Sequence, residues 1–274
     1  MAKERENQQV EMGFLDHLEE LRWHLIRSFL AIVIFAIVAF IFQDFIFDKI
    51  ILAPKSPNFF TNSLFCRFGN YFNAPSLCIN SLPFQIINIK MAGQFSTSIM
   101  VSLVVGFVVA FPFVFWEIWR FIKPALYSNE KKHARGAVFV SSVLFMIGVL
   151  FGYYIIIPLT IHFFGSYNVS TQVVNQINLD SYISTFTSVI LAAGLIFELP
   201  IIIYFLSKAG LITPEFLKKY RKHSLVVILI VAAVITPPDV FSQILVSLPL
   251  ILLYEVGIVI SKRVVAKDRN LLAQ

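Results

Sequence analysis

A single acidic side chain, Glu198, interrupts a long apolar run of the sequence. From residue 190 to residue 203 all residues except Glu198 are uncharged, a composition typical of a membrane span. An ionised carboxylate near the centre of a spanning helix costs roughly 2.5–3.5 kcal/mol on insertion scales. The chain must therefore either protonate Glu198 or give it a polar partner. Glu198 is a candidate functional residue, and a protonated carboxyl that serves packing alone is the alternative.

Pro200 lies two residues beyond Glu198 and marks the same segment as locally polar. A proline has no backbone N–H, so a carbonyl one turn earlier loses its helical partner. We expect the helix to bend here. Gln243, in the last apolar segment, is another polar side chain that could pair across helices or lie at a membrane interface.

A second acidic candidate, Glu20, lies near the start of the chain. Residues 14–27 predict an amphipathic helix that runs into the first apolar segment. Its apolar face carries Phe14, Leu18, Leu21 and Leu25, and the opposite face carries Asp16, Glu20, Trp23 and Arg27. A carboxylate this close to a basic membrane face suits a cationic ligand. Alternatively, Glu20 pairs with His24 or Arg27 inside the helix, a weak interaction.

The third acidic candidate, Glu130, lies in a segment, 116–132, that is rich in aromatic and basic residues. Such aromatic side chains are typical of the membrane interface. Pro124 predicts that the helix bends or ends after Lys123. Glu130 stands beside Lys131 and Lys132, so neutralisation by these lysines is the alternative to ligand binding.

The elements that must position these acids are membrane helices. The chain has 274 residues, of which 58% are hydrophobic and only 14% are charged, so we expect an all-α, polytopic integral membrane protein. A window of about 20 residues finds six apolar segments. They are 25–45, 95–115, 138–164, 183–206, 225–235 and 240–260. We expect six transmembrane helices, the last two short and joined by the turn Thr236, Pro237, Pro238 and Asp239.

The basic residues predict the orientation of these spans. Of the 22 Lys and Arg residues, only Lys49, Lys55, Arg67 and Lys90 fall on one side, and the other 18 fall on the opposite side. The positive-inside rule then places both termini in the cytoplasm. The basic pI of about 9.3 therefore reflects topology, and nucleic acid is not an expected partner.

The predicted organisation is one transmembrane domain, 1–274, with three polar parts. These are a cytoplasmic amphipathic segment at 1–24, a structured periplasmic cap loop at 46–94 and a cytoplasmic tail at 261–274. The two cysteines, Cys66 and Cys78, both lie in the cap loop. In an oxidising compartment they could form a disulfide, and two free thiols are an equal alternative.

The motifs of catalysis are missing from the sequence. There is no G-x-S-x-G, H-E-x-x-H or Walker motif, and the five histidines have no metal-ligand spacing. We expect no catalytic residue, no metal and no cofactor. A proton-coupled small-solute transporter that uses Glu198 as its proton carrier is the alternative function.

Taken in order along the chain, five stretches resemble the TatC family, the multi-spanning subunit of the twin-arginine protein translocase. The family resemblance covers nearly the whole chain, and the fourth stretch is highly specific. The stretches are His17-Leu-Glu-Glu-Leu-Arg22, Trp119-Arg-Phe-Ile-Lys-Pro-Ala-Leu-Tyr127 with Glu130, Phe197-Glu-Leu-Pro200, Ile235-Thr-Pro-Pro-Asp-Val-Phe-Ser-Gln243 and Leu253-Tyr-Glu-Val-Gly257.

The resemblance implies a receptor for signal peptides that carry an arginine pair. Glu20 and Glu130 would be the carboxylates that bind the two guanidinium groups. The remaining members of this site would be Phe121, Pro124, Arg22 and Leu126.

The resemblance also implies partners in the membrane. Single-span subunits of the TatA and TatB type would dock at Glu198, Pro200 and Gln243, and Pro237, Pro238 and Asp239 would shape the periplasmic hairpin. The expected function is export of folded precursors, driven by the proton-motive force, across the bacterial inner membrane. Self-association in a larger complex is expected as well.

Two positions depart from the pattern of the family. Residue 117 is Glu where the family usually has Gln, and the loop at 46–94, with its two cysteines, is longer than usual.

Overall fold

The computed structural model describes residues 14–74, 78–79, 85–122, 134–170, 172–173 and 175–272. Pro124, Leu126 and Glu130 of the predicted recognition site lie outside these residues. Side chains are described from residue 19 onward in the first helix and up to residue 266 in the last.

The described chain is almost entirely helical. The elements that cross the apolar layer are α1 (Phe14–Ile41), α4 (Gly93–Ile122), α5 (Ala134–Phe151) with α6 (Ile157–Ser166), α7 (Leu179–Ile196) with α8 (Leu199–Lys208), α10 (Arg221–Ile235) and α11 (Val240–Leu272). The shorter elements are α2 (Gln43–Phe45), α3 (Phe60–Tyr71), β1 (Ile86–Ile87), β2 (Ile177–Asn178) and α9 (Pro214–Lys219). Two π-helical segments, Ile46–Ile51 and Gly152–Ile156, and a 3-10 turn, Ala53–Lys55, complete the set.

Five of the helical segments are long and apolar enough to span a membrane within the described residues. The sixth predicted span is α10, whose 15 residues rise by about 22 Å, less than the ~30 Å core of a bilayer. The prediction of six spans with a short fifth is confirmed. The expectation that the last span is also short was wrong, because α11 continues for 33 residues through a tail of good helix formers.

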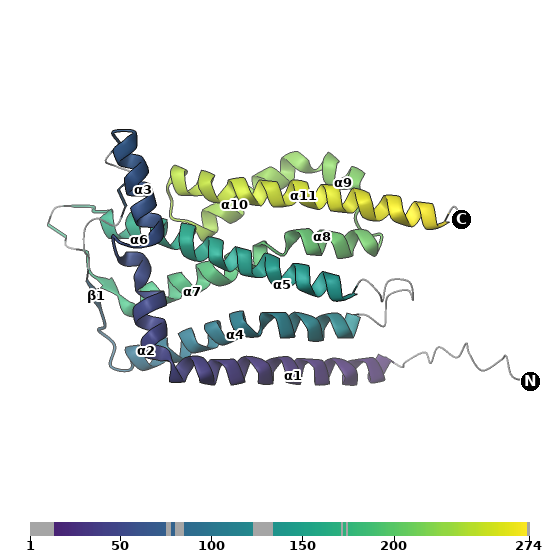
Figure 1. Cartoon of the computed structure of the whole chain (residues 1–274), viewed down its shortest axis with the longest axis horizontal. Helices are drawn as coiled ribbons and strands as arrows, with labels where there is room; N and C mark the ends of the chain where they lie inside the picture. The colour runs from purple at the N-terminus through teal and green to yellow at the C-terminus, as the bar shows by residue number, and fades with distance from the viewer. Residues whose placement is uncertain are drawn as a thin grey trace, which may run out of the picture.

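The long helices form one bundle in which neighbours in space are not always neighbours in sequence (Figure 1). α1 packs along α4, α5 packs against α7, and α8 packs against α11. The start of α1 and the end of α11 lie at the same end of the bundle, as an even number of spans requires (Figure 1). α3 and β1, which belong to the same loop, lie at the opposite end.

The fourth span breaks at Glu198, as the proline predicts. α7 ends at Ile196 and α8 begins at Leu199. The Glu198 backbone N–H donates to the Leu195 carbonyl, at 3.1 Å, instead of to the carbonyl four residues back. Pro200 has no N–H and is buried at the start of α8. The turn therefore holds Glu198 inside the bundle at the joint of two helices.

The hairpin between α10 and α11 is closed by its own polar side chains. Asp239 Oδ2 accepts a 2.7 Å hydrogen bond from the Ser242 backbone N–H and caps α11. Thr236 Oγ1 donates to the Ala232 carbonyl at 2.8 Å, which satisfies the end of α10. The side-chain amide of Gln243 donates to the Leu229 carbonyl at 3.2 Å and joins the two helices.

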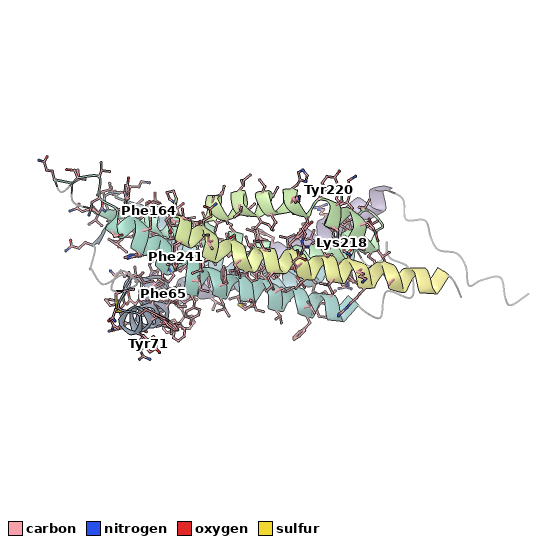
Figure 2. All side chains as sticks on the ribbon, turned by 90° about the horizontal axis from the view of Figure 1, so that it is seen from above. Phe65, Tyr71, Phe164, Lys218, Tyr220 and Phe241 are labelled. Carbon is pink, nitrogen blue, oxygen red and sulfur yellow. A yellow bond between two sulfur atoms is a disulfide. The ribbon has the colours of Figure 1, made fainter. Side chains whose placement is uncertain are left out.

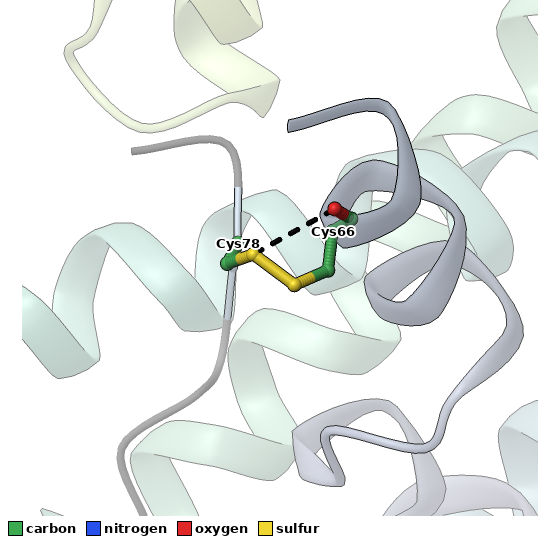
Figure 3. Close-up of a disulfide and its surroundings, with 2 residues drawn as sticks. All are labelled: Cys66 and Cys78. Atoms are coloured by element: carbon green, nitrogen blue, oxygen red, sulfur yellow. Dashed lines mark hydrogen bonds between the residues drawn. A yellow bond between two sulfur atoms is a disulfide. The ribbon is translucent and has the colours of Figure 1, made fainter. Parts of the chain in front are cut away.

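The described residues of the loop at 46–94 include the helix α3 and the strand β1. Cys66 of α3 and Cys78, which are 12 positions apart in the sequence, are joined by a disulfide (Figure 3). β1 pairs in parallel with β2, with Ile86 opposite Ile177, and so connects the loop at 46–94 to the loop between α6 and α7.

Two glycines allow the helices to approach each other closely. A Cβ at Gly106 of α4 would lie 2.6 Å from the Ala36 backbone nitrogen of α1, and a Cβ at Gly148 of α5 would lie 2.6 Å from the Ala193 carbonyl oxygen of α7. These contacts are with backbone, which cannot move aside as a side chain can. The spacing of Gly148 and Gly152, a weak sign of close packing in the sequence, is part of the contact between α5 and α7.

We predict that Gly148→Ala lowers the free energy of unfolding by about 1–3 kcal/mol, because the added methyl group forces α5 away from α7. Gly136→Ala is the matched control, since Gly136 lies in the same helix and its Cβ would meet nothing within 4 Å. Both changes gain the helix propensity of alanine, so their difference isolates the clash. Thermal unfolding of the purified protein in detergent measures it. Equal stability of the two variants would show that the helices are not in close contact.

Candidate functional site

The packing of α1 on α4 places polar residues of α1 at the helix interface. His24 and Ser28 face α4 and are buried, whereas Leu25 and Phe29 are exposed. The amphipathic helix is therefore turned opposite to the ordinary arrangement, with apolar residues on the outside, where lipid surrounds a membrane protein. Ser28 Oγ is satisfied by the His24 carbonyl at 2.9 Å.

The buried imidazole of His24 is paired with a carboxylate from α4. His24 Nδ1 lies 2.5 Å from Glu117 Oε2, and the two residues are only 6% and 4% exposed. Arg27 Nη1 lies 3.8 Å from the same carboxylate oxygen, with its side chain half-exposed. Among the described residues, His24 is thus the direct partner of Glu117, and Arg27 adds positive charge nearby. A buried carboxylate requires such partners, because an unpaired one is costly.

Glu20 lies beside this pair. Its Oε1 is 3.9 Å from His24 Nε2, one helical turn away, and its side chain is 35% exposed. Its Oε2 is buried and has no hydrogen-bond partner among the described residues. The ring of Phe121 meets the His24 ring edge-on, with centroids 6.2 Å apart. His24 therefore brings together Glu20 and Phe121, two of the residues predicted for the recognition site.

The other predicted residues of this site lie elsewhere or are not described. Arg22 is exposed on α1, away from the face that holds His24. Glu130, Pro124 and Leu126 lie outside the described residues. The structure thus places Glu20 and Phe121 together and leaves the rest of the site a prediction.

The pairing of His24 with Glu117 was not predicted from the sequence. The spacing in the sequence indicated His24 only as a partner of Glu20 within the helix, and Glu117 stood out only as a departure from the family. The two paired residues are 93 positions apart, so no local pattern could join them. Two signals in the sequence pointed to it. Glu20, His24 and Arg27 are spaced to lie on one helical face, and Glu117 is the one acid in the aromatic-rich helix α4.

The intramembrane candidate Glu198 also has a partner on a neighbouring helix. Ser141 of α5 donates a 2.7 Å hydrogen bond to Glu198 Oε2. Both residues are buried. The second carboxyl oxygen, Oε1, is buried and without a hydrogen-bond partner among the described residues. One oxygen of Glu198 is therefore hydrogen-bonded to Ser141. The other is available for a hydrogen bond with an additional polar group.

Gln243 does not join Glu198 in this arrangement. Its described hydrogen bond goes to α10, within the hairpin that also contains Pro237, Pro238 and Asp239. Of these three, Pro237 is buried and Pro238 is exposed.

Comparison with known proteins identifies one family. A family model described as Sec-independent protein translocase protein (TatC) matches residues 16–249. The Sec-independent protein translocase protein TatC of Blattabacterium sp. subsp. Periplaneta americana is 42% identical over 257 residues, which cover 93% of this chain and 97% of the relative. The TatC of Aquifex aeolicus is 34% identical over 262 residues, covering 95% and 99%.

A solved structure shares the fold as well. The crystal structure of a twin-arginine translocase receptor, TatC, is 34% identical in sequence, with a TM-score of 0.67 over 91% of this chain and 99% of that chain.

We predict strong coupling between His24 and Glu117. Either His24→Leu or Glu117→Met alone leaves a buried polar partner and is expected to cost about 3–5 kcal/mol of stability. The double variant removes both groups and should cost clearly less than the sum of the two. Thermal unfolding of the four proteins in detergent gives the coupling energy.

An exposed ion pair provides the control for this cycle. Lys90 Nζ lies 2.6 Å from Asp180 Oδ2, with side chains 61% and 43% exposed. Its cycle, with Lys90→Met and Asp180→Asn, should give less than about 1 kcal/mol. If the stability losses of the His24 and Glu117 variants simply add in the double variant, the two residues do not interact as a buried pair.

Proposed function

The chain belongs to the TatC family of Sec-independent protein translocase proteins, and from this we propose that it is the signal-peptide receptor and core subunit of a twin-arginine translocase. The family consists of protein translocase components and is not a family of enzymes. In the proposal the chain binds twin-arginine signal peptides of folded precursors at the cytoplasmic face. It then assembles with single-span partner subunits for export driven by the proton-motive force.

The observation that carries the proposal is the unpaired carboxylate oxygen of Glu20. Oε2 of this side chain lacks a hydrogen-bond partner among the described residues, while Oε1 lies near His24. A guanidinium group presents several N–H donors in a plane and binds carboxylates through two parallel hydrogen bonds. An arginine of a signal peptide would supply the donor that Glu20 lacks.

The neighbours of Glu20 support the same interpretation. His24 is held by Glu117 on the α4 side, so it cannot swing toward solvent without breaking a buried contact. Phe121 covers the edge of His24 and adds an apolar wall. In our proposal Glu130 provides the second carboxylate, and Pro124, Leu126 and Arg22 complete the site. The apolar part of the signal peptide would lie against the helices, as in other complexes of a helix with a groove.

Glu198 is the proposed docking point for the single-span subunits. Its free oxygen, Oε1, is buried at the joint of α7 and α8, where Pro200 leaves the helix irregular. A polar side chain on a partner helix would satisfy this oxygen in the apolar layer. Gln243 belongs to the same proposal, with its amide nitrogen already bonded to Leu229.

The proposed orientation rests on charge. Both ends of the described chain lie at one end of the bundle (Figure 1), the end with the excess of Lys and Arg. The positive-inside rule makes that end cytoplasmic, in a bacterial inner membrane. The external loops, including α3, would then face the periplasm, where the disulfide can form. Self-association within a larger translocase complex is part of the proposal.

We predict that Glu20→Gln weakens binding of a twin-arginine signal peptide by roughly 10–100-fold, because a charge-assisted hydrogen bond is worth about 1.5–3 kcal/mol. Glu19→Gln is the matched control, since Glu19 is the neighbouring acid in α1 and is exposed. Fluorescence anisotropy with a labelled peptide and protein in nanodiscs measures the affinity. If both variants bind like the wild type, Glu20 does not contact the arginines.

We also predict that Glu198→Ala abolishes co-purification with a single-span partner and leaves peptide affinity unchanged. The two sites use different helices, so one can fail without the other. Glu255→Ala is the control, because Glu255 is an acid of α11 whose partner is Arg221, at 2.5 Å. Equal recovery of the partner with the Glu198 and Glu255 variants would contradict the docking proposal.

A further inference from the structure

α3, the helix of the loop at 46–94, has an apolar face that is largely exposed. Phe60, Leu64, Phe68 and Tyr71 follow one another at intervals of four, four and three residues, so they lie on one side of the helix. Their exposed fractions are 65%, 39%, 52% and 81%. Four large apolar side chains in a row are unusual on a surface that faces water.

A second side of α3 faces the protein. Thr61, Asn62 and Gly69 are buried there. The Asn62 side chain donates to the Pro54 carbonyl at 2.9 Å, and Thr61 Oγ1 donates to the carbonyl of Tyr154 in the third span. This side of α3 thus buries two polar residues, Thr61 and Asn62, while large apolar residues of the same helix stay exposed, the reverse of a soluble helix.

The third side of α3 is polar and accessible. It carries Ser63, Arg67 and Asn70, of which Arg67 and Asn70 are exposed. A helix with one apolar side, one polar side and a basic residue at the boundary is typical of helices that lie in the interface of a bilayer. An arginine at the boundary can extend its guanidinium group to lipid phosphates.

The direction of α3 suits that position. Figure 1 shows α3 crossing the end of the bundle, whereas the spanning helices run along it. Figure 2, turned by 90°, shows α3 nearly end-on, so the two views agree that it is roughly perpendicular to the spans. Perpendicular to the spans means parallel to the membrane plane.

The contacts of α3 place it at the level where the spans begin. Phe65 packs against Phe241, the second residue of α11, with ring centroids 6.5 Å apart, and Tyr71 lies on the other side of α3 from Phe241 (Figure 2). Phe60 meets Tyr154 edge-on at 6.1 Å. Tyr154 and Phe241 both belong to membrane spans. α3 is therefore held at the edge of the apolar layer, and the disulfide at Cys66 fixes its rotation.

The apolar face of α3 continues a surface that faces lipid. Along the third span, five of the exposed large apolar residues form a stripe that leads to Tyr154, which contacts Phe60. The stripe consists of Phe139, Val143, Ile147, Leu150 and Tyr154. Lipid chains that cover this stripe reach the external end of α5 and meet α3 there. The same lipid can cover Phe60 and the residues that follow it.

We propose that α3 lies in the external leaflet of the membrane, with Phe60, Leu64, Phe68 and Tyr71 among the lipid chains and Arg67 at the headgroups. Lipid is the partner because the apolar face is continuous with the lipid-facing stripe of the third span. The role of α3 is then to anchor the cap loop to the bilayer beside the short α10–α11 hairpin.

Tryptophan fluorescence in proteoliposomes tests this proposal. Phe68→Trp places a probe on the apolar face, and Asn70→Trp, two residues away, places one on the polar side. The emission of the parent protein, with its three native tryptophans, is subtracted. We expect the Phe68→Trp emission to shift to shorter wavelength. We also expect lipids brominated near the headgroup to quench it several-fold more strongly than the Asn70→Trp emission.

Two results would overturn the proposal. Equal, water-like emission from both probes would place the apolar face of α3 in the aqueous phase. A blue shift at Phe68→Trp that brominated lipid does not quench, and that disappears when the protein is diluted in lipid, would show that a second copy of the chain covers this face. The measurements are made without reductant, so that the disulfide stays intact.

Discussion

The structure depends on one constraint, namely that polar groups within the bilayer must find their partners inside the protein, because hydrocarbon supplies none. This constraint explains why the spans are helical and why many serines and threonines within them donate back to a carbonyl four residues earlier, as Ser102 and Thr187 do. It also explains why the two acids within the bundle are paired across helices, Glu117 with His24 and Glu198 with Ser141. Among the described residues, Glu20 and Glu198 each have one buried carboxyl oxygen without a hydrogen-bond partner, and both proposed binding sites are built on these oxygens.

The two proposed sites use this constraint in different ways. At Glu20 the carboxylate is partly exposed at the end of the bundle, where a charged peptide can reach it from water. At Glu198 the carboxyl is buried between helices, where only another helix can supply a partner. One site thus suits a soluble ligand with its own charge, and the other suits a subunit that is already in the membrane. The chain can hold both without conflict, because they lie on different helices.

Much of the fold could be predicted from the sequence, because apolar length and proline position are local signals. The six spans, the bend at Glu198 and the polar turn at Thr236–Asp239 all follow from such signals. The length of α11 could not be predicted from hydropathy, because its last turns lie beyond the apolar segment. The sequence also failed to show which face of α1 meets α4. Hydropathy favours the leucines, yet the buried face holds His24, since a polar pair inside the protein and leucines toward lipid satisfy the constraint better. The disulfide was left open by the sequence, because spacing alone does not bring two cysteines together.

The central claim is that Glu20 binds a guanidinium group of the signal peptide, and the coupling energy between the two groups tests it most directly. The affinities of wild type and Glu20→Gln are measured for a signal peptide with its arginine pair and for a version with two lysines. The account predicts that the loss on changing arginine to lysine is large in the wild type and much smaller in Glu20→Gln, because lysine cannot form the paired hydrogen bonds and the variant no longer accepts them. The same loss in both proteins would mean that the arginines bind elsewhere, and it would contradict the account.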